Sequence, residues 1–180
     1  MPFYQSKGDV PPKRHTVFKN PNGGIYYEEL VSREGFSYMY SNLYHLNMPT
    51  QVASLGDFKK ENKYTYSKED HRPHHFVPMN LKNGNPHQLL MYNKDVAISL
   101  FDIKDSDILD DSTFYRQGDS DLLIYIQKGK GLLKTNYGNL AFHEGDYIIV
   151  PRGVIYQYGI TSDSVSGLII KSTAPIETPS

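Results

Sequence analysis

Residues 119–158 decide the fold, and from Asp119 to Tyr158 they read DSDLLIYIQKGKGLLKTNYGNLAFHEGDYIIVPRGVIYQY. Short apolar runs alternate here with glycine-containing turns, which is typical of antiparallel strands joined by tight connections. The predicted strands are Leu122–Ile126, Leu132–Tyr137 and Tyr147–Val150. Pro151 follows the last of them, at a strand end where its missing N–H costs no ladder hydrogen bond. The stretch therefore predicts an all-β domain.

The spacing of Gly145, Pro151 and Gly153 resembles the second sequence signature of the cupin family. The resemblance implies a cupin-type double-stranded β-helix, also called a jelly roll. Upstream of it, Ile25–Val31 is a predicted strand, and the alternation of aromatic and polar residues from Phe36 to Ser41 is typical of a second, half-buried one. The fold expected is an all-β cupin jelly roll preceded by an N-terminal β-rich arm.

The metal site of the cupin family looks erased in this chain. The resemblance implies a histidine ligand three positions after Gly153, and this position holds Tyr156. It implies two further histidines between Tyr115 and Gly118 and a glutamate near Leu122, yet none of these positions holds a histidine or a carboxylate. The sequence therefore offers no metal ligand and no catalytic residue on the scaffold. Tyr115 and Tyr156 are expected to fill the barrel mouth as aromatic packing.

Length and composition restrict the class of protein. The 180 residues suit one domain with an extended arm, and 19 Lys and Arg against 20 Asp and Glu leave a net charge of −1. This balance gives no argument for nucleic acid or for an anionic membrane, and no apolar run approaches the length of a membrane span. The chain has no cysteine and no apolar N-terminal leader, which fits a reducing, cytoplasmic location.

Three histidines form the most conspicuous alternative site. His71, His74 and His75 follow Asp70 closely, and imidazole is a ligand for iron, zinc, copper or nickel. Neighbouring residues of an extended chain point to opposite faces, so His74 and His75 do not readily share one ion. A surface or structural role is therefore preferred, although a metal enzyme built on this cluster or on His143 stays open.

Four aspartates form a second candidate metal site in the loop after residue 104, namely Asp105, Asp107, Asp110 and Asp111. Their spacing differs from that of an EF-hand calcium loop, so this loop is expected to be solvated.

The chain as a whole resembles homogentisate 1,2-dioxygenase of the bacterial type. The resemblance is carried, in the right order, by residues 13–18, 28–30, 34–37, 43–45, 93–99, 114–116, 145–153 and 172–176. The family is a bicupin that opens the ring of homogentisate with O2 in tyrosine and phenylalanine catabolism. It uses one non-haem Fe(II) on a triad of two histidines and one carboxylate, located in the C-terminal half.

This chain resembles only the N-terminal half of that family. The resemblance implies an arm over residues 1–88, a degenerate, metal-less cupin core over 89–174, and the start of a linker over 175–180. Its implied role is to support a C-terminal catalytic cupin within a homo-oligomer. The chain by itself is then expected to bind no Fe(II) and to be inactive, and its partner-facing surface is expected to be apolar.

A second hypothesis belongs to another class of function. A stand-alone degenerate cupin would bind a small aromatic acid or a protein partner without catalysis. Arginine beside tyrosine suits an aromatic carboxylate, and the pocket would lie at the barrel mouth. Its candidate residues are Tyr115, Arg116, Arg152 and Tyr156, with Tyr125 and Tyr158 near them in sequence.

Overall fold

The structure is a computed structural model that describes residues 18–32, 35, 40–57, 70, 72–73, 75, 87–104 and 113–177. The chain divides into two compact units. The first is Pro11–Phe76, and the second is Val77–Ser180 together with Met1–Val10. Every element in the described residues is a β-strand, and none of these residues belongs to a helix long and apolar enough to cross a membrane. The all-β prediction is confirmed.

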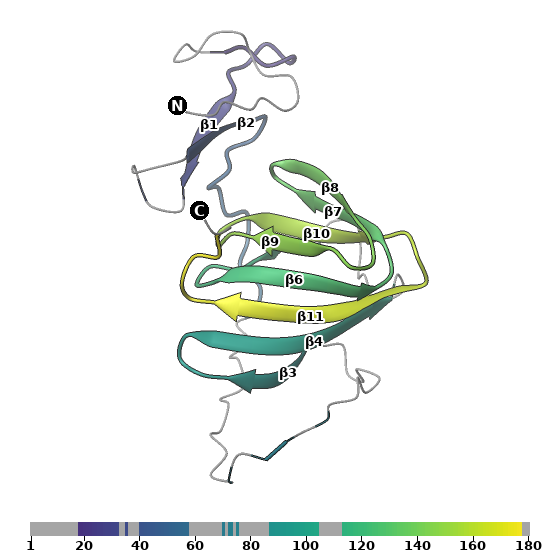
Figure 1. The fold of residues 1–180 in the computed structure, drawn as a ribbon. Coiled ribbons are helices and arrows are strands. Elements are labelled where there is room, and N and C mark those ends of the chain that lie inside the picture. Colours follow the sequence, from purple (N-terminus) through teal and green to yellow (C-terminus); the bar gives the residue numbers. More distant parts are fainter. Residues whose placement is uncertain are drawn as a thin grey trace. The chain divides into compact units, whose positions relative to one another are not determined.

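A single antiparallel hairpin forms the described part of the first unit (Figure 1). Its strands are β1 (Tyr27–Ser32) and β2 (Tyr40–His45). His45 ends β2, and its Nε2 lies 2.9 Å from Oε2 of Glu29 on the neighbouring strand. The ring of Phe18 meets the ring of Tyr44 edge to face, with 5.3 Å between the centroids. The predicted arm is therefore β-rich where it is described.

Two antiparallel sheets build the second unit (Figure 1). The five-stranded sheet has the order β3-β4-β11-β6-β9, and the four-stranded sheet has the order β5-β10-β7-β8. From β4 to β11 the chain changes sheet at every step except β7 to β8, so it winds around both sheets as a jelly roll does. The strands are β3 (His87–Tyr92), β4 (Val96–Lys104), β5 (Tyr115–Arg116), β6 (Asp121–Lys128), β7 (Gly131–Thr135), β8 (Gly138–Phe142), β9 (Tyr147–Val150), β10 (Ile155–Ile160) and β11 (Ser164–Ser172). The predicted cupin-type fold is confirmed.

The hydrophobic core lies between the two sheets. Leu122, Ile124 and Ile126 of β6 are fully buried, whereas Leu123 and Tyr125 between them are only half-buried. This alternation follows from the two-residue period of a strand, which sends neighbouring side chains to opposite faces. The four-stranded sheet contributes buried side chains from three strands, namely Leu133, Phe142, Tyr156 and Tyr158.

The glycines of the cupin signature are needed for their backbone conformation. Gly145 has φ +90° and Gly153 has φ +82°, in the left-handed region that glycine enters without a steric penalty. Gly145 opens the turn into β9, and Gly153 turns the chain from β9 into β10. The N–H of Gly153 donates to the carbonyl of Gln117 at 2.7 Å, which ties this turn to the segment after β5.

Some candidate features lie outside the described residues. These include His71, His74, the acidic loop and the basic cluster at residues 13–15. His75 is described and is exposed. Within the described ranges there is no group of three His, Cys, Asp or Glu side chains that could hold a metal ion.

Candidate functional site

Tyr115 and Tyr156 lie side by side, although 41 positions separate them in the sequence. They are register partners on the antiparallel strands β5 and β10, and their ring centroids are 5.8 Å apart. Because the side chains of such partners share one face of a sheet, the pair occupies one place in the barrel wall. The sequence placed both residues at cupin ligand positions, and the structure brings them together.

An aromatic row continues from this pair into the core. The ring of Tyr156 meets Tyr158 edge to face at 5.7 Å, and Tyr158 stacks on Phe101 of the opposite sheet at 6.3 Å. Tyr115 is 40% exposed, whereas the other three rings are buried. The Tyr158 hydroxyl has no hydrogen-bond partner among the described residues. The interior at this place is therefore filled by ring-to-ring packing.

Burial controls the ionisation of these phenols. It raises the pKa of Tyr156 to about 12, and the neighbouring Tyr115 adds to the rise. Burial likewise raises the pKa of Tyr158 well above its ordinary value, with smaller contributions from Tyr156 and Tyr115. Both side chains are neutral phenols at neutral pH, because desolvation disfavours the phenolate.

The residues at the cupin ligand positions do not fit Fe(II). A facial triad requires imidazole and carboxylate donors, but the positions hold two tyrosines and Leu122, whose side chain is part of the hydrophobic core. A neutral, buried phenol is a poor metal ligand, and a leucine is none. The donor chemistry at these three positions therefore does not suit an iron-dependent step.

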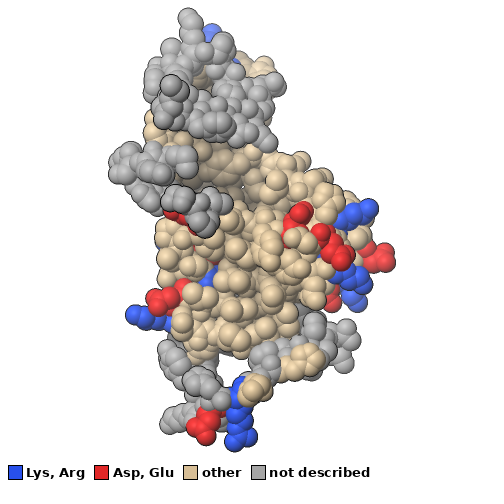
Figure 2. All heavy atoms as spheres, in the orientation of Figure 1, with Lys and Arg blue, Asp and Glu red and all other residues tan. Residues whose placement is uncertain are grey.

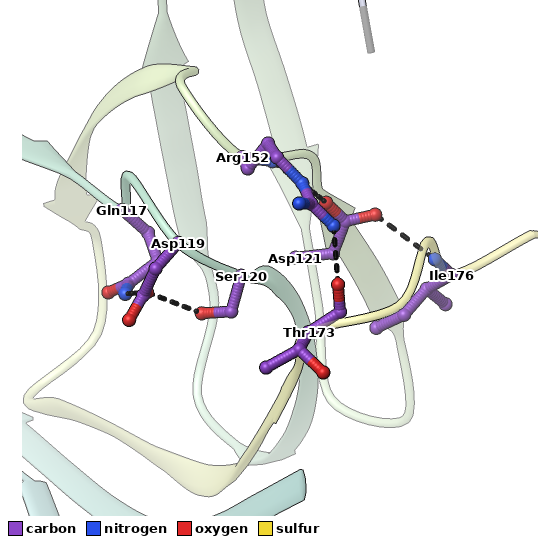
Figure 3. Close-up of polar contacts among 7 residues, drawn as sticks. All are labelled: Gln117, Asp119, Ser120, Asp121, Arg152, Thr173 and Ile176. Carbon is purple, nitrogen blue, oxygen red and sulfur yellow. Dashed lines mark hydrogen bonds and ion pairs between the residues drawn. The ribbon is translucent and has the colours of Figure 1, made fainter. Parts of the chain in front are cut away.

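The two candidate arginines make different structural contacts. Arg116 donates from Nε to the carbonyl of Gly153 at 3.0 Å, beside the aromatic pair. Arg152 directly precedes Gly153 and faces Asp121, which is fully buried at the start of β6 (Figure 3). Its backbone N–H donates to Oδ1 of Asp121 at 3.0 Å, and its Nε lies 3.4 Å from the same oxygen.

Asp121 also holds the segment that follows the last strand. The N–H of Ile176 donates to Oδ2 of Asp121 at 3.0 Å, and Nη2 of Arg152 donates to the carbonyl of Thr173 at 2.7 Å (Figure 3). One buried carboxylate thus joins β6, the turn after β9 and the residues after β11. We call Asp121, Arg152, Thr173 and Ile176 the carboxylate latch.

A second polar cluster lies in the segment between β5 and β6, directly before Asp121. Gln117 donates from Nε2 to Asp119, and the hydroxyl of Ser120 donates to the same carboxylate at 3.2 Å (Figure 3). The hydrogen bond from Gln117 lowers the pKa of Asp119 most, and Ser120 and Lys171 lower it further. Asp119 is therefore a carboxylate at neutral pH.

Sequence reasoning missed His87, the first residue of β3. It is the register partner of the buried Phe101 and is itself half-buried. Burial, together with a smaller contribution from the positive charge of Lys171, lowers the pKa of His87 to about 4. The sequence shows His87 before an apolar run. It does not show that the His87 side chain points inward, because the register of the strand is set by its partner strands.

Other candidate residues lie elsewhere on the barrel. Tyr125 faces outward from the five-stranded sheet, with its ring 4.8 Å from that of Tyr147. His143 borders a shallow hollow of about 410 Å³ at the end of the barrel where β6, β8 and β10 terminate. This hollow mixes both charge signs, and it is lined by Lys128, Lys130, Glu144 and Asp163 among others.

Solved structures similar to part of this chain are cupin domains. The Schizosaccharomyces pombe Cnp3 cupin domain has 16% identity and a TM-score of 0.42, covering 49% of this chain and 64% of that domain. The plu4264 protein of Photorhabdus luminescens has 12% identity and a TM-score of 0.43, covering 54% of this chain and 86% of that one.

Sequence relatives are more specific. A protein of Saccharolobus solfataricus that is named as a candidate dioxygenase is 34% identical over 160 residues, which are 87% of this chain. The match covers 41% of that relative, so this chain spans about two fifths of its length. The family model described as "Homogentisate 1,2-dioxygenase N-terminal" matches residues 61–179. This chain therefore belongs to the N-terminal family of homogentisate 1,2-dioxygenase.

Proposed function

We propose that this chain is the N-terminal supporting part of an iron-dependent homogentisate 1,2-dioxygenase. The observation that carries the proposal is the family match over residues 61–179, on a barrel whose ligand positions hold Tyr115, Tyr156 and Leu122. The Fe(II), the ring cleavage and the acid–base chemistry then belong to a C-terminal catalytic cupin. Tyrosine and phenylalanine catabolism in the cytoplasm is the proposed setting.

The proposed role of this chain is mechanical. Its barrel offers a packed interior instead of a reaction chamber, and the carboxylate latch fixes the backbone at Ile176. A linker beginning at residue 175 would therefore leave the barrel at a defined place. Such anchoring reduces the conformational freedom of whatever follows, which suits a support that orients a catalytic domain inside a homo-oligomer.

Oxygen consumption tests this division of roles. The 180-residue chain, supplied anaerobically with Fe(II) and then with homogentisate and O2, is expected to consume no oxygen above the rate of free Fe(II). The native protein from the same source is the positive control, and its intact mass is expected to exceed 20.6 kDa clearly. Sustained turnover by the 180-residue chain alone would refute the proposal.

The stand-alone binding hypothesis has one favourable observation, the partly exposed ring of Tyr115 next to Arg116. Two contacts weigh against it. The Arg152 guanidinium already bonds Asp121 and Thr173, and consecutive strand residues such as Tyr115 and Arg116 point to opposite faces. Calorimetric titration with phenylacetate distinguishes the two hypotheses, since saturable heat that Tyr115→Ala removes would favour a binding domain.

A further inference from the structure

Two largely apolar rows of side chains cross the outer face of the five-stranded sheet. Register partners share a face, so the strand pairings define these rows. One row runs through all five strands as Met91, Ile98, Ile170, Leu123 and Ile149. The next row begins at the polar Gln88 and continues through Leu100, Leu168, Tyr125 and Tyr147. We call the nine apolar residues of these rows the outer apolar face.

Solvent reaches this face mainly at its two edge strands, whereas Leu100 near its middle is buried. Tyr147 is 68% exposed, Met91 is 52% exposed and Ile149 is 39% exposed. Figure 2 shows the middle of the surface over β4, β11 and β6 without Lys, Arg, Asp or Glu among the described residues. An antiparallel sheet with one solvated face normally alternates apolar and polar residues, whereas here the middle of β4, β11 and β6 is apolar on both faces. Such a surface marks a contact with another protein surface.

We propose that the outer apolar face is the docking surface for the catalytic C-terminal cupin, an inference that rests on the proposed function. The length of the relative supplies the first argument, since 59% of it, 100% minus the 41% matched, has no counterpart in this chain. The described chain ends beside this face, which supplies the second. Ile176 is bonded to Asp121 at the start of β6, two positions before Leu123 of the apolar row.

The chemistry of the face indicates the form of the partner surface. Five strands at about 4.8 Å spacing give a width near 19 Å between the outermost strand axes, with no charge in either row to pair with a polar partner. A second apolar sheet packed about 10 Å away fits such a surface. Tyr125 on β6 and Tyr147 on the edge strand β9 would contribute an aromatic pair to the contact, and tyrosine is enriched among the residues that contribute most to binding in protein interfaces.

Hydroxyl-radical footprinting on the native protein tests the proposal. Oxidation of Tyr147 and Met91 is measured in the native polypeptide and in the 180-residue chain, and it is expected to fall at least fivefold in the former. Phe114 and Leu140 are 51% exposed and precede or form strands of the other sheet, so their oxidation is expected to stay unchanged. Ile149→Lys in the native polypeptide should restore the reactivity of Tyr147, whereas the matched control Leu140→Lys should not.

The alternative outcomes separate the two proposals. Unprotected Tyr147 and Met91 in a native polypeptide that oxidises homogentisate would overturn the docking surface and leave the proposed function standing. A native polypeptide that ends at Ser180 and acts with no second cupin would overturn both. Equal protection in the 180-residue chain, with a mass of two copies by light scattering that Ile149→Lys halves, would assign the face to a second copy and overturn the proposal.

Discussion

Replacing Asp121 by alanine should destabilise the barrel by about 3–4 kcal/mol. The carboxylate is fully buried and accepts the backbone N–H groups of Arg152 and Ile176, each at 3.0 Å. A hydrogen bond to a charged group contributes at least about 1.5 kcal/mol, and losing two of them leaves two partly buried N–H donors without this acceptor. The ion pair with the partly exposed Arg152 guanidinium adds less than about 1 kcal/mol, because solvent screens it.

Two further variants divide this sum. Asp121→Asn keeps one acceptor oxygen but turns an amide N–H toward the second donor, so a loss of about 2 kcal/mol is expected. Arg152→Met keeps the backbone hydrogen bond and should cost about 1 kcal/mol. Urea denaturation followed by circular dichroism measures all three, and an unchanged m-value shows that the midpoint shift reports stability. A loss below about 1 kcal/mol for Asp121→Ala would refute the reasoning.

Three other predictions concern buried groups. The pKa of His87 is about 4 in the folded chain and 6.5 in the unfolded chain, so the unfolded state binds more protons between these two pH values. Stability measured by urea denaturation should therefore fall by about 2 kcal/mol from pH 7 to pH 4.5. The His87→Gln variant should not show this loss. Absorbance at 295 nm should show Tyr156 ionising only near pH 12 and Tyr158 only well above the ordinary pKa of a tyrosine. Added Fe(III) should give no tyrosinate charge-transfer band at pH 7, and a band that Tyr156→Phe abolishes would contradict the packing role. Gly167→Ala should lower the free energy of unfolding by at least about 3 kcal/mol, because a methyl group there would overlap the carbonyl oxygen of Tyr125. The control Gly118→Ala adds a methyl group that meets nothing within 4 Å, so it should leave the free energy of unfolding nearly unchanged in the same assay.

The strands with clear alternation or flanking turns were predictable from the sequence. Tyr147–Val150 is β9 as predicted, and the pattern from Asp95 to Ile103 became β4 (Val96–Lys104). The return strand Leu132–Tyr137 is shorter, since β7 is Gly131–Thr135, and the chain turns at Asn136 and Tyr137. β8 (Gly138–Phe142) was not predicted, because Gly138 and Asn139 favour a turn in the local sequence. The strand forms there because it pairs with β7.

The candidate site depended on contacts that local patterns do not contain. The signature spacing placed Tyr156 correctly relative to Gly153, and the pairing of Tyr156 with Tyr115 follows from the topology. The burial of Asp121 could not be read from its acidic surroundings, since a carboxylate next to Asp119 and Ser120 looks solvated in the sequence. Its partners come from the turn after β9 and the segment after β11, which are 31 and 55 positions away.

The same limit applies to the outer apolar face. The alternation of Val96, Ile98 and Leu100 in the sequence indicates one shared face of a strand, and the pairings of Ile98 with Ile170 and of Leu100 with Leu168 agree with this. A period of two shows that residues share a face, but it does not show which face meets the core. Only the sheet order reveals that these residues point away from the barrel interior while Phe101 and Ile103 point inward.

The aromatic row from Tyr115 to Phe101 has a consequence for attempts to restore a metal centre. Tyr156→His would supply one imidazole, but two or three more ligands would have to replace Tyr115, neighbours in β5 and the core residue Leu122. Replacing Tyr156 removes a ring that now packs against Tyr158, and replacing Leu122 removes apolar volume from the core, so the resulting voids cost free energy before any ion binds. Each single substitution therefore lowers the stability of the fold without creating a metal site, and iron binding would require several coordinated substitutions in the interior.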